Sequence, residues 1–341
     1  VALSFTRSVA DVRALRAYCR AAWGWFARGE EPDDADDAAL FRALDERLPD
    51  LRAQYTGDEP RLRVVAKLET RAATRNLDGI LGEANAVMVA RGDLGLQCRP
   101  EDVPWLQKDI VRRARLLGRP AIVATQMLGS MEHAPEPTRA EAADVFNAVL
   151  DGADALMLSA ETATGVDPHR AVRTLRAIAE TAEEWERKRL TGRGFHLNTL
   201  RQRIEALRAA QQRTPGWVDV TDRMTLEAVR IAEGLRLAAI VATTRSGQTA
   251  RHVARFDPLV PVVAIVPDER VARRLALSGS VRAVVAPAES AEAALQRGLV
   301  RAVRAGLLED GARVLVVGAR AGDPPGATTE MSIRRVRADV G

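Results

Sequence analysis

Short apolar runs separated by helical segments make up the region between residues 62 and 185. The runs are LRVVAK (62–67), AVMVAR (86–91), AIVATQ (121–126) and ALMLSA (155–160). They are continuous rather than alternating, which is typical of strands buried on both faces. Apolar residues recur at helical spacing between them, so the region predicts βαβ units and a parallel sheet. The opening VALSF predicts a fifth strand, whereas a closed (β/α)₈ barrel needs eight.

A second alternating region begins near residue 220. The predicted strands are AAIVATT, VPVVAIV, VRAVVA and RVLVVGA, with helical segments between them. The fold class expected for the whole chain is α/β: a partial (β/α)₈ TIM-type barrel, then an α/β C-terminal domain with a mostly parallel sheet. We expect the incomplete barrel domain at 1–187, with an acidic, turn-rich insertion at about 22–60, and the C-terminal domain at 188–341.

Composition excludes several classes of protein. The chain is 47% hydrophobic and 28% charged, which is ordinary for a globular protein. No run approaches the ~20 apolar residues of a membrane span, and the first residues lack a signal-peptide layout, so we expect a cytoplasmic protein with no membrane contact. The net charge of +4 comes from basic residues interleaved with acids, which disfavours nucleic-acid binding. The two cysteines, Cys19 and Cys98, form no metal-binding or disulfide pattern.

Charged residues stand at the predicted C-terminal ends of the strands, where such folds place their functional side chains. Lys67 ends one run with Glu69 two residues on, and the next run leads to Asp93. Two carboxylates from neighbouring strand ends suit one Mg²⁺, with the ammonium beside it. A metal, an ammonium and free backbone amides fit an enolate or a transferring phosphoryl group. The alternative is an architectural ion pair at the rim of the barrel.

Three long stretches resemble the pyruvate kinase family: RLRVVAKLET, AVMVARGDLGLQ, and the segment from RPAIVATQMLGSM to LMLSAETATG. VALSFTRSVADV resembles the strand before the lysine strand, and TTRSGQTARHVARF resembles the family's regulatory domain more loosely. The resemblance implies phosphoryl transfer from phosphoenolpyruvate to ADP, giving pyruvate and ATP, the last step of glycolysis. It also implies Mg²⁺ (or Mn²⁺) and K⁺ as cofactors.

The resemblance assigns roles to individual positions. Lys67 would stabilise the phosphoryl group in transfer and the enolate, while Glu69 and Asp93 would bind Mg²⁺. Ser159 and Glu161 would belong to the proton-relay side of the site. The implied substrate-binding residues are Lys67, Ala90, Arg91, Gly92, Asp93 and Thr125, of which Thr125 would sit beside the carbon that becomes the methyl group. Two positions depart from the family pattern: Ala160 replaces a usual Gly, and Thr70 a usual Asn.

Other family features concern parts outside the matched stretches. The resemblance implies three earlier barrel strands and a capping domain that supply the K⁺ and nucleotide ligands, and none of them is in this sequence. It also implies a sugar-phosphate effector at the loop of Thr244, Ser246, Gly247, Gln248 and Thr249. Hydroxyl and N–H groups at a helix start suit a phosphate, and the alternative is an ordinary turn with a helix cap.

Three functions remain open at this point. The first is a partial or split pyruvate kinase, acting as a homotetramer or with a complementary N-terminal chain. The second is a non-catalytic paralogue that binds a metabolite or serves as a regulatory subunit. The third is a Mg²⁺-dependent lyase or aldolase acting on pyruvate-like acids, in which Lys67 and the C-terminal domain would have no role.

Overall fold

The computed structural model describes residues 1–28, 35, 38, 39, 42, 63–191, 218–320, 322–323 and 327–337. The chain forms two compact units, Val1–Leu106 and Gln107–Gly341. Most of the predicted insertion at 22–60 lies outside the described residues, and the predicted domain limit at 187 stays a prediction. Among the described residues, no helix combines the length and apolar character needed to cross a membrane.

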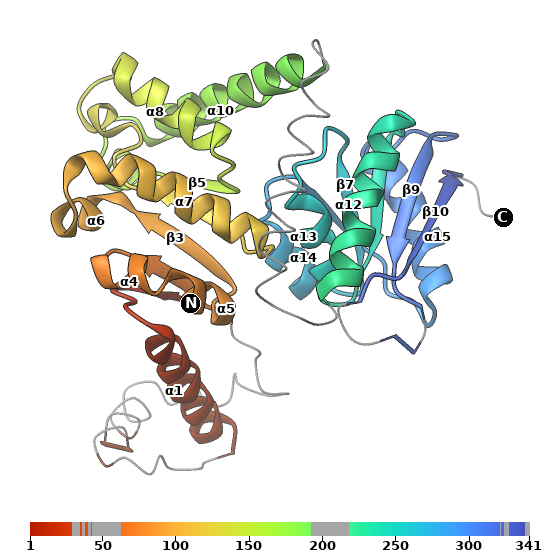
Figure 1. Ribbon diagram of the computed structural model, residues 1–341, viewed down its shortest axis with the longest axis horizontal. Helices are drawn as coiled ribbons and strands as arrows, with labels where there is room; N and C mark the ends of the chain where they lie inside the picture. The colour runs from red at the N-terminus through yellow and green to blue at the C-terminus, as the bar shows by residue number, and fades with distance from the viewer. Residues whose placement is uncertain are drawn as a thin grey trace. The chain divides into compact units, whose positions relative to one another are not determined.

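Three parallel strands organise the first unit. β1 (Ala2–Leu3) pairs with β2 (Val65–Leu68), and β2 pairs with β3 (Ala86–Ala90). All five residues of β3 are buried, as its continuous apolar run predicts. The helices of this unit are α1 (Val9–Arg28), α4 (Arg71–Arg75), α5 (Leu77–Glu83), α6 (Arg91–Gln97) and the 3₁₀ helix Pro100–Asp102. Figure 1 shows β3 leading directly toward α6.

The second unit contains two further strands of the barrel type, β4 (Ala121–Ala124) and β5 (Ala155–Met157), which pair in parallel. The five strands predicted for the first region are therefore all present. The helices around them are α7 (Val103–Leu116), which begins in the first unit, the 3₁₀ helix Gly129–Glu132, α8 (Arg139–Leu150), α9 (Ala160–Ala163) and α10 (Pro168–Thr191). α8 and α10 lie side by side, and the rings of Phe146 and Trp185 pack edge to face at 5.8 Å.

A five-stranded sheet with the order β10-β9-β6-β7-β8 forms the rest of the second unit. Its strands are β6 (Ala239–Thr243), β7 (Val262–Val266), β8 (Val281–Val285), β9 (Arg313–Gly318) and β10 (Glu330–Arg335). Four are parallel, as predicted, and β10 runs antiparallel to β9. The helices are α12 (Val218–Gly234), α13 (Gln248–Ala254), α14 (Glu269–Leu275) and α15 (Ala291–Arg304).

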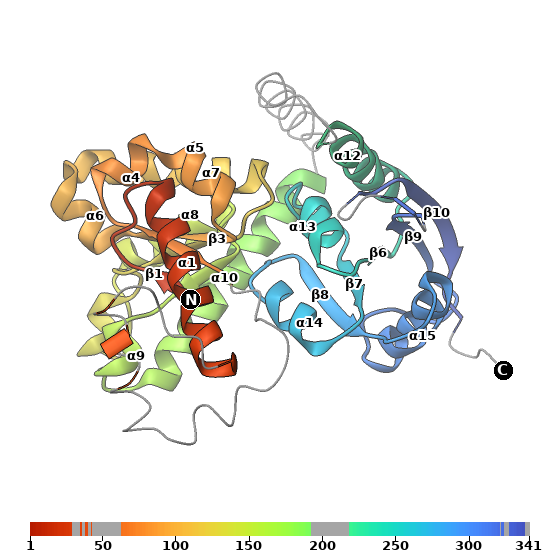
Figure 2. The ribbon, with the colours of Figure 1, turned by 90° about the horizontal axis from the view of Figure 1, so that it is seen from below.

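Alternate residues of the strands supply two apolar cores, one on each face of this sheet. Ile240 and Ala242 of β6 face the core formed with α12, α13 and α14. Ala239 and Val241 face the core formed with α15. Figure 2 shows α15 on the opposite side of the strands from α12 and α13. Burial on both faces explains why these strands are apolar at every position rather than at every second one.

The contact between α15 and β7 depends on the absence of a side chain at Gly298. A Cβ atom there would lie 2.6 Å from Cδ1 of the buried Ile265. We predict that Gly298→Ala lowers the free energy of unfolding by about 1–3 kcal/mol through overpacking. Gly234→Ala is the control, because a Cβ there meets no atom within 4 Å; it should stabilise by at most about 1 kcal/mol. Urea unfolding measures both, and a shift of the two variants in the same direction would contradict the packing argument.

Candidate functional site

Lys67 and Glu69 form a tight ion pair at the C-terminal end of β2. The Lys67 Nζ atom lies 2.6 Å from Oε1 of Glu69 and donates a hydrogen bond to Oγ of Ser4 at 3.1 Å. The Glu69 side chain is only 1% exposed, whereas that of Lys67 is 25% exposed. The ammonium therefore reaches solvent beside a carboxylate that is buried.

The Glu69 carboxylate has further partners that keep it ionised. The backbone N–H of Phe5 donates to Oε2 at 2.5 Å, and the Asp93 side chain lies close to the same group. Burial alone would raise the pKa of Glu69, but the hydrogen bonds from Lys67 and Phe5 outweigh it and hold the pKa below its ordinary value of 4.5. Glu69 therefore carries its negative charge at neutral pH.

Asp93 joins this pair from the neighbouring strand. It lies in the first turn of α6, which starts immediately after β3 with Ala90 as its N-cap residue. The parallel register places Leu68 opposite Val89, so the ends of β2 and β3 meet at the same edge. The structure thus brings together Lys67, Glu69 and Asp93, the three side chains on which the sequence-based hypothesis depends.

The pair of carboxylates is compatible with one divalent cation. Among the described residues, no cluster of three or more histidine, cysteine or acidic side chains has the arrangement of a metal site. Glu69 and Asp93 are the two ligands predicted from the sequence. Mg²⁺ commonly binds through one or two carboxylates and completes its octahedron with water and substrate oxygens. The residues present fit Mg²⁺ in that mode.

Thr125 and Gln126 follow β4 in an unusual backbone conformation. Their φ angles are 70° and 53°, in the left-handed region that a β-branched residue rarely adopts. The Thr125 hydroxyl donates to the carbonyl of Ala124 at 2.6 Å. Such strain is characteristic of functional sites, where surrounding contacts hold it in place.

Glu161 provides contacts that hold this loop. Its side chain is buried, Oε1 accepts the backbone N–H of Leu128 at 3.0 Å, and Oε2 accepts that of Ser159 at 2.6 Å. Ser159 is the N-cap residue of α9. Both oxygens of Glu161 are thus engaged by backbone donors, and the carboxylate ties the end of β5 to the loop after β4.

The predicted site residues fall into two groups. Lys67, Glu69 and residues 90–93 belong to the unit Val1–Leu106, and Thr125, Ser159 and Glu161 belong to the unit Gln107–Gly341. Each group has the internal geometry given above.

The predicted effector loop is braced by its own hydroxyl groups. The backbone N–H of Gly247 donates to Oγ1 of Thr244 at 3.0 Å, and that of Gln248 lies 3.4 Å from Oγ of Ser246. Gly247 has φ +80° and precedes α13 directly. Thr249 is buried, and its hydroxyl accepts a hydrogen bond from that of Thr328 at 3.3 Å. These contacts brace the turn, and the N-cap residue of α13 is Gly247, with no side-chain cap on the helix.

Comparison with known proteins identifies the family. The family model "Pyruvate kinase, barrel domain" matches residues 39–172, and "Pyruvate kinase, alpha/beta domain" matches residues 222–334. The chain belongs to the pyruvate kinase family. This membership agrees with the α/β fold class expected from the sequence.

The similar pyruvate kinases are longer than the part that matches. A pyruvate kinase of Staphylococcus epidermidis is 45% identical over 146 residues, which are 43% of this chain and 25% of that protein. A pyruvate kinase of Agrobacterium vitis is 53% identical over 124 residues, 36% of this chain and 26% of that protein. The crystal structure of a pyruvate kinase from Cryptosporidium parvum has a TM-score of 0.74 and 28% identity, covering 98% of this chain and 58% of that one. The matched part thus spans about a quarter of these curated relatives.

Sequence reasoning within the pyruvate kinase resemblance missed two contributors to the Lys67–Glu69 pair. Ser4 accepts from Lys67, and the backbone of Phe5, at φ 51°, donates to Glu69. Both residues follow β1, so they stand at a strand end as the other site residues do. Their position directly after a strand was the feature of the sequence that could have identified them. The donor on Phe5 is a backbone group, which the identity of the side chain does not reveal.

Glu141 organises the segment between β4 and α8 of this pyruvate kinase family member. Its carboxylate accepts the backbone N–H and hydroxyl groups of both Ser130 and Thr138, in a capping box at the start of α8. Burial raises the pKa of Glu141, but these hydrogen bonds lower it more, to below 4.5. The ionised form is therefore favoured by folding.

We predict that Glu141→Gln lowers the free energy of unfolding at neutral pH by about 1 kcal/mol. Because the folded-state pKa lies below the ordinary value, the advantage of the carboxylate is complete above 4.5 and is lost as the pH falls through the folded-state pKa. Urea unfolding at neutral and successively lower pH should show the two proteins converging. Glu180→Gln, at an exposed pair with Arg176 on α10, is the control and should change little. A constant difference at all pH values would exclude the ionised carboxylate as the cause.

Proposed function

We propose that this chain binds phosphoenolpyruvate and takes part in transfer of its phosphoryl group to ADP, giving pyruvate and ATP. The observation that supports this proposal is the convergence of Lys67, Glu69 and Asp93 at the ends of β2 and β3. One partly exposed positive charge beside two acidic groups suits a substrate whose negative charge moves between a phosphoryl group and an enolate.

Each of these side chains has a distinct role in the proposal. Lys67, one quarter exposed, offers its ammonium to the phosphoryl oxygen and then to the enolate oxygen. Glu69 and Asp93 would hold Mg²⁺ or Mn²⁺, which when bound neutralises charge on the substrate oxygens. Glu69 needs no deprotonation to act at neutral pH, because its pKa is held below the ordinary value. Binding of K⁺ is inferred from the family alone.

The substrate carboxylate is assigned to the start of α6. The first backbone N–H groups of the helix, those of Ala90, Arg91 and Gly92, follow the end of β3, and the N-terminal end of a helix favours an anion. A carboxylate bound there lies next to Asp93 in sequence. Gly92 adds no side chain that would hinder its approach.

Protonation of the enolate is assigned to the Thr125 side. Thr125 would contact the carbon that becomes the methyl group, and Ser159 would supply the hydroxyl of the donor chain. Glu161 accepts two backbone N–H groups, including that of Ser159. It therefore acts in this proposal as the positioning residue of the relay rather than as its terminal acid.

The wider setting is also part of the proposal. We place the protein in the cytoplasm, as a homotetramer or in association with a chain that supplies the nucleotide-binding part. A sugar phosphate at Thr244, Ser246, Gly247, Gln248 and Thr249 would be its effector. The matched part spans about a quarter of the curated relatives. The activity of a whole pyruvate kinase is therefore a proposal for this chain.

We predict that the full chain binds oxalate, a planar dianion that resembles the enolate of pyruvate, only when Mg²⁺ or Mn²⁺ is present. Glu69→Gln should weaken this binding by about 10–100-fold, since even changes to the partners of metal ligands have effects of that size. Lys67→Met should weaken it by at least about tenfold, because a charge-assisted contact is lost. Calorimetric titration measures each affinity. Lys108→Met, whose ammonium pairs with Asp151, is the matched control and should bind normally.

A coupled assay with phosphoenolpyruvate, ADP, Mg²⁺ and K⁺ then tests turnover. Metal-dependent oxalate binding with turnover supports the proposal. Binding without turnover favours a metabolite-binding or regulatory subunit instead. Release of pyruvate from a longer oxo-acid or hydroxy-acid, with no nucleotide, selects a lyase. Oxalate binding that is independent of metal and of Glu69 would contradict the site itself.

A further inference from the structure

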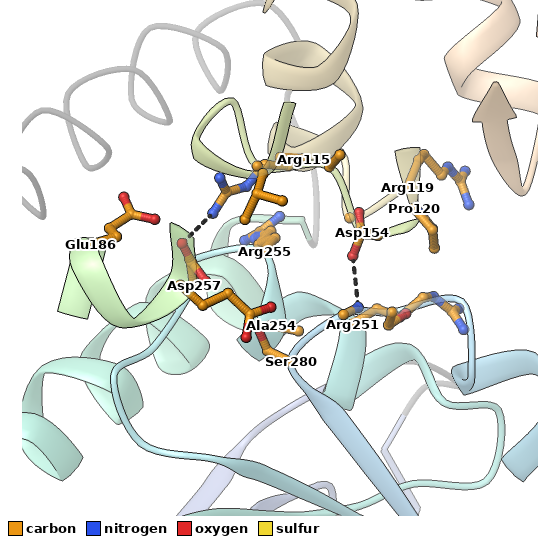
Figure 3. A pocket seen from close by; sticks show the side chains of 17 residues that line it. Arg115, Arg119, Pro120, Asp154, Glu186, Arg251, Ala254, Arg255, Asp257 and Ser280 are labelled. Atoms are coloured by element: carbon orange, nitrogen blue, oxygen red, sulfur yellow. Dashed lines mark hydrogen bonds and ion pairs between the residues drawn. The ribbon is translucent and has the colours of Figure 1, made fainter. Parts of the chain in front are cut away.

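The second unit contains a polar cavity that is lined by none of the residues of the proposed active site. Its volume is about 100 Å³, and its walls come from the end of α7, the turn before β5, α10, the end of α13 and the loop after α14. Figure 3 shows Arg255 between Arg115 and Asp154, with Asp257 facing Arg115. The residues that matter below are Arg115, Gly152, Asp154, Arg255, Asp257 and Ser278.

The guanidinium of Arg255 is a buried charge of this cavity. Its side chain is 4% exposed; Nη2 lies 2.5 Å from Oδ1 of Asp222, and Nη1 donates to the carbonyl of Leu116 at 3.1 Å. Its Nε atom is buried and has no hydrogen-bond partner among the described residues. A buried N–H of a guanidinium group that lacks an acceptor is costly.

Ser278 presents a second unsatisfied group to the same cavity. The residue is 3% exposed, and its Oγ atom also lacks a partner among the described residues. The Nε–H of Arg255 can only donate, and the hydroxyl of Ser278 is able to donate. A single group rich in acceptor oxygens therefore satisfies both.

Arg115 adds a positive charge beside Gly152, where the lack of a side chain leaves room for the guanidinium group. Gly152 has φ +93°, and a Cβ atom there would lie 1.8 Å from Nη1 of Arg115. The guanidinium thus occupies the space that any other residue would fill. Its Nη2 atom is 3.4 Å from Oδ2 of Asp257, longer than an ordinary hydrogen bond. Arg115 retains capacity for a closer acceptor.

Two of the acidic groups of the cavity have partners in its wall. Asp154 accepts the backbone N–H of Ala121 at 3.0 Å and that of Gly279 at 3.1 Å. Asp257 faces Arg115, while Glu183 and Glu186 line the cavity from α10. Nε of Arg255 and Oγ of Ser278, which lack partners among the described residues, are both able to donate.

The pKa of the neighbouring His252 reflects the burial and the positive charges around it. Burial, followed by the positive charges of Arg255, Arg251 and Arg119, lowers the pKa of His252 to about 3. The imidazole is therefore neutral at physiological pH. Burial disfavours a charge of either sign, but the three nearby arginine charges disfavour only a further positive charge and favour a negative one.

We propose that this cavity binds a small oxyanion, either an inorganic phosphate or sulfate ion or the phosphate group of a monoester, between Arg255, Arg115 and Ser278. A cavity of about 100 Å³ has room for one tetrahedral oxyanion, since one water needs only about 10–15 Å³ by the same measure. The oxyanion accepts from Nε of Arg255, from the guanidinium of Arg115 and from the hydroxyl of Ser278.

The proposal is tested on the full chain with inorganic phosphate, sulfate and glycerol 3-phosphate as probes. Calorimetric titration in magnesium-free buffer should give saturable binding of at least the inorganic ions, and each bound ion should raise the melting temperature by mass action. Ser278→Ala and Arg115→Gln should each weaken binding by about tenfold, the effect of losing one hydrogen bond to a charged group. Arg304→Gln, an exposed arginine on α15, is the matched control and should bind as the wild type does.

Ser278→Ala also separates binding from folding. Its hydroxyl has no partner among the described residues, so the variant should unfold at no lower temperature than the wild type in anion-free buffer. Binding of glycerol 3-phosphate as well would assign a phosphate monoester, and binding of the inorganic ions alone would assign a free ion. The proposal is overturned by the absence of saturable binding. It is equally overturned by binding that survives both cavity variants and is lost in Ser246→Ala, which would locate the anion at the loop before α13.

Discussion

The buried carboxylate of Glu69 is the constraint around which the first unit is arranged. A negative charge that is 1% exposed is tolerated only if donors surround it. Those donors are the ammonium of Lys67, two residues away, and the backbone N–H of Phe5 after β1, and the Asp93 carboxylate from the end of β3 lies beside them. The parallel register of β1, β2 and β3 delivers all three to one edge. The same arrangement that satisfies the charge also assembles the candidate metal ligands.

This double role affects how variants of the site are interpreted. Removing the Lys67 ammonium also removes a hydrogen-bond donor from a buried carboxylate, which costs stability as well as binding. Glu69→Gln keeps the size of the side chain and can still accept from Phe5. A loss of ligand affinity in that variant is therefore the cleaner measure of function, and the stability of both proteins has to be compared before their activities are.

Carboxylates that accept backbone N–H groups recur in the second unit. Glu161 joins the loop after β4 to the end of β5, and Glu141 joins Ser130 to the start of α8. Asp154 joins β4 to the loop after α14, and burial raises its pKa. Each group uses both oxygens, so it fixes two segments at once. The positive φ angles of Thr125 and Gln126 lie within a loop held in this way.

The hydrophobic pattern predicted most strands well, because a strand buried on both faces is apolar at nearly every position. β3 and β7 are apolar at every position, and both were expected. β10 was not, since its sequence EMSIRR is mostly exposed and its only sheet neighbour among the described residues is β9. At such an edge, backbone hydrogen bonds to β9 define the strand while the side chains stay polar.

The groups of the candidate site likewise divide into those that the sequence predicts and those that only the fold reveals. Lys67, Glu69 and Asp93 were predictable because charged side chains at buried strand ends stand out against an apolar run. Phe5 was not, since it contributes a backbone N–H whose direction depends on a φ angle of 51°. Glu161 illustrates the intermediate case: its position after a strand was visible, yet the sequence could not reveal that two backbone donors already occupy its oxygens. The sequence states the chemistry of each side chain. Which backbone groups bond to that side chain, and therefore which of its atoms remain available to a ligand, depends on the fold.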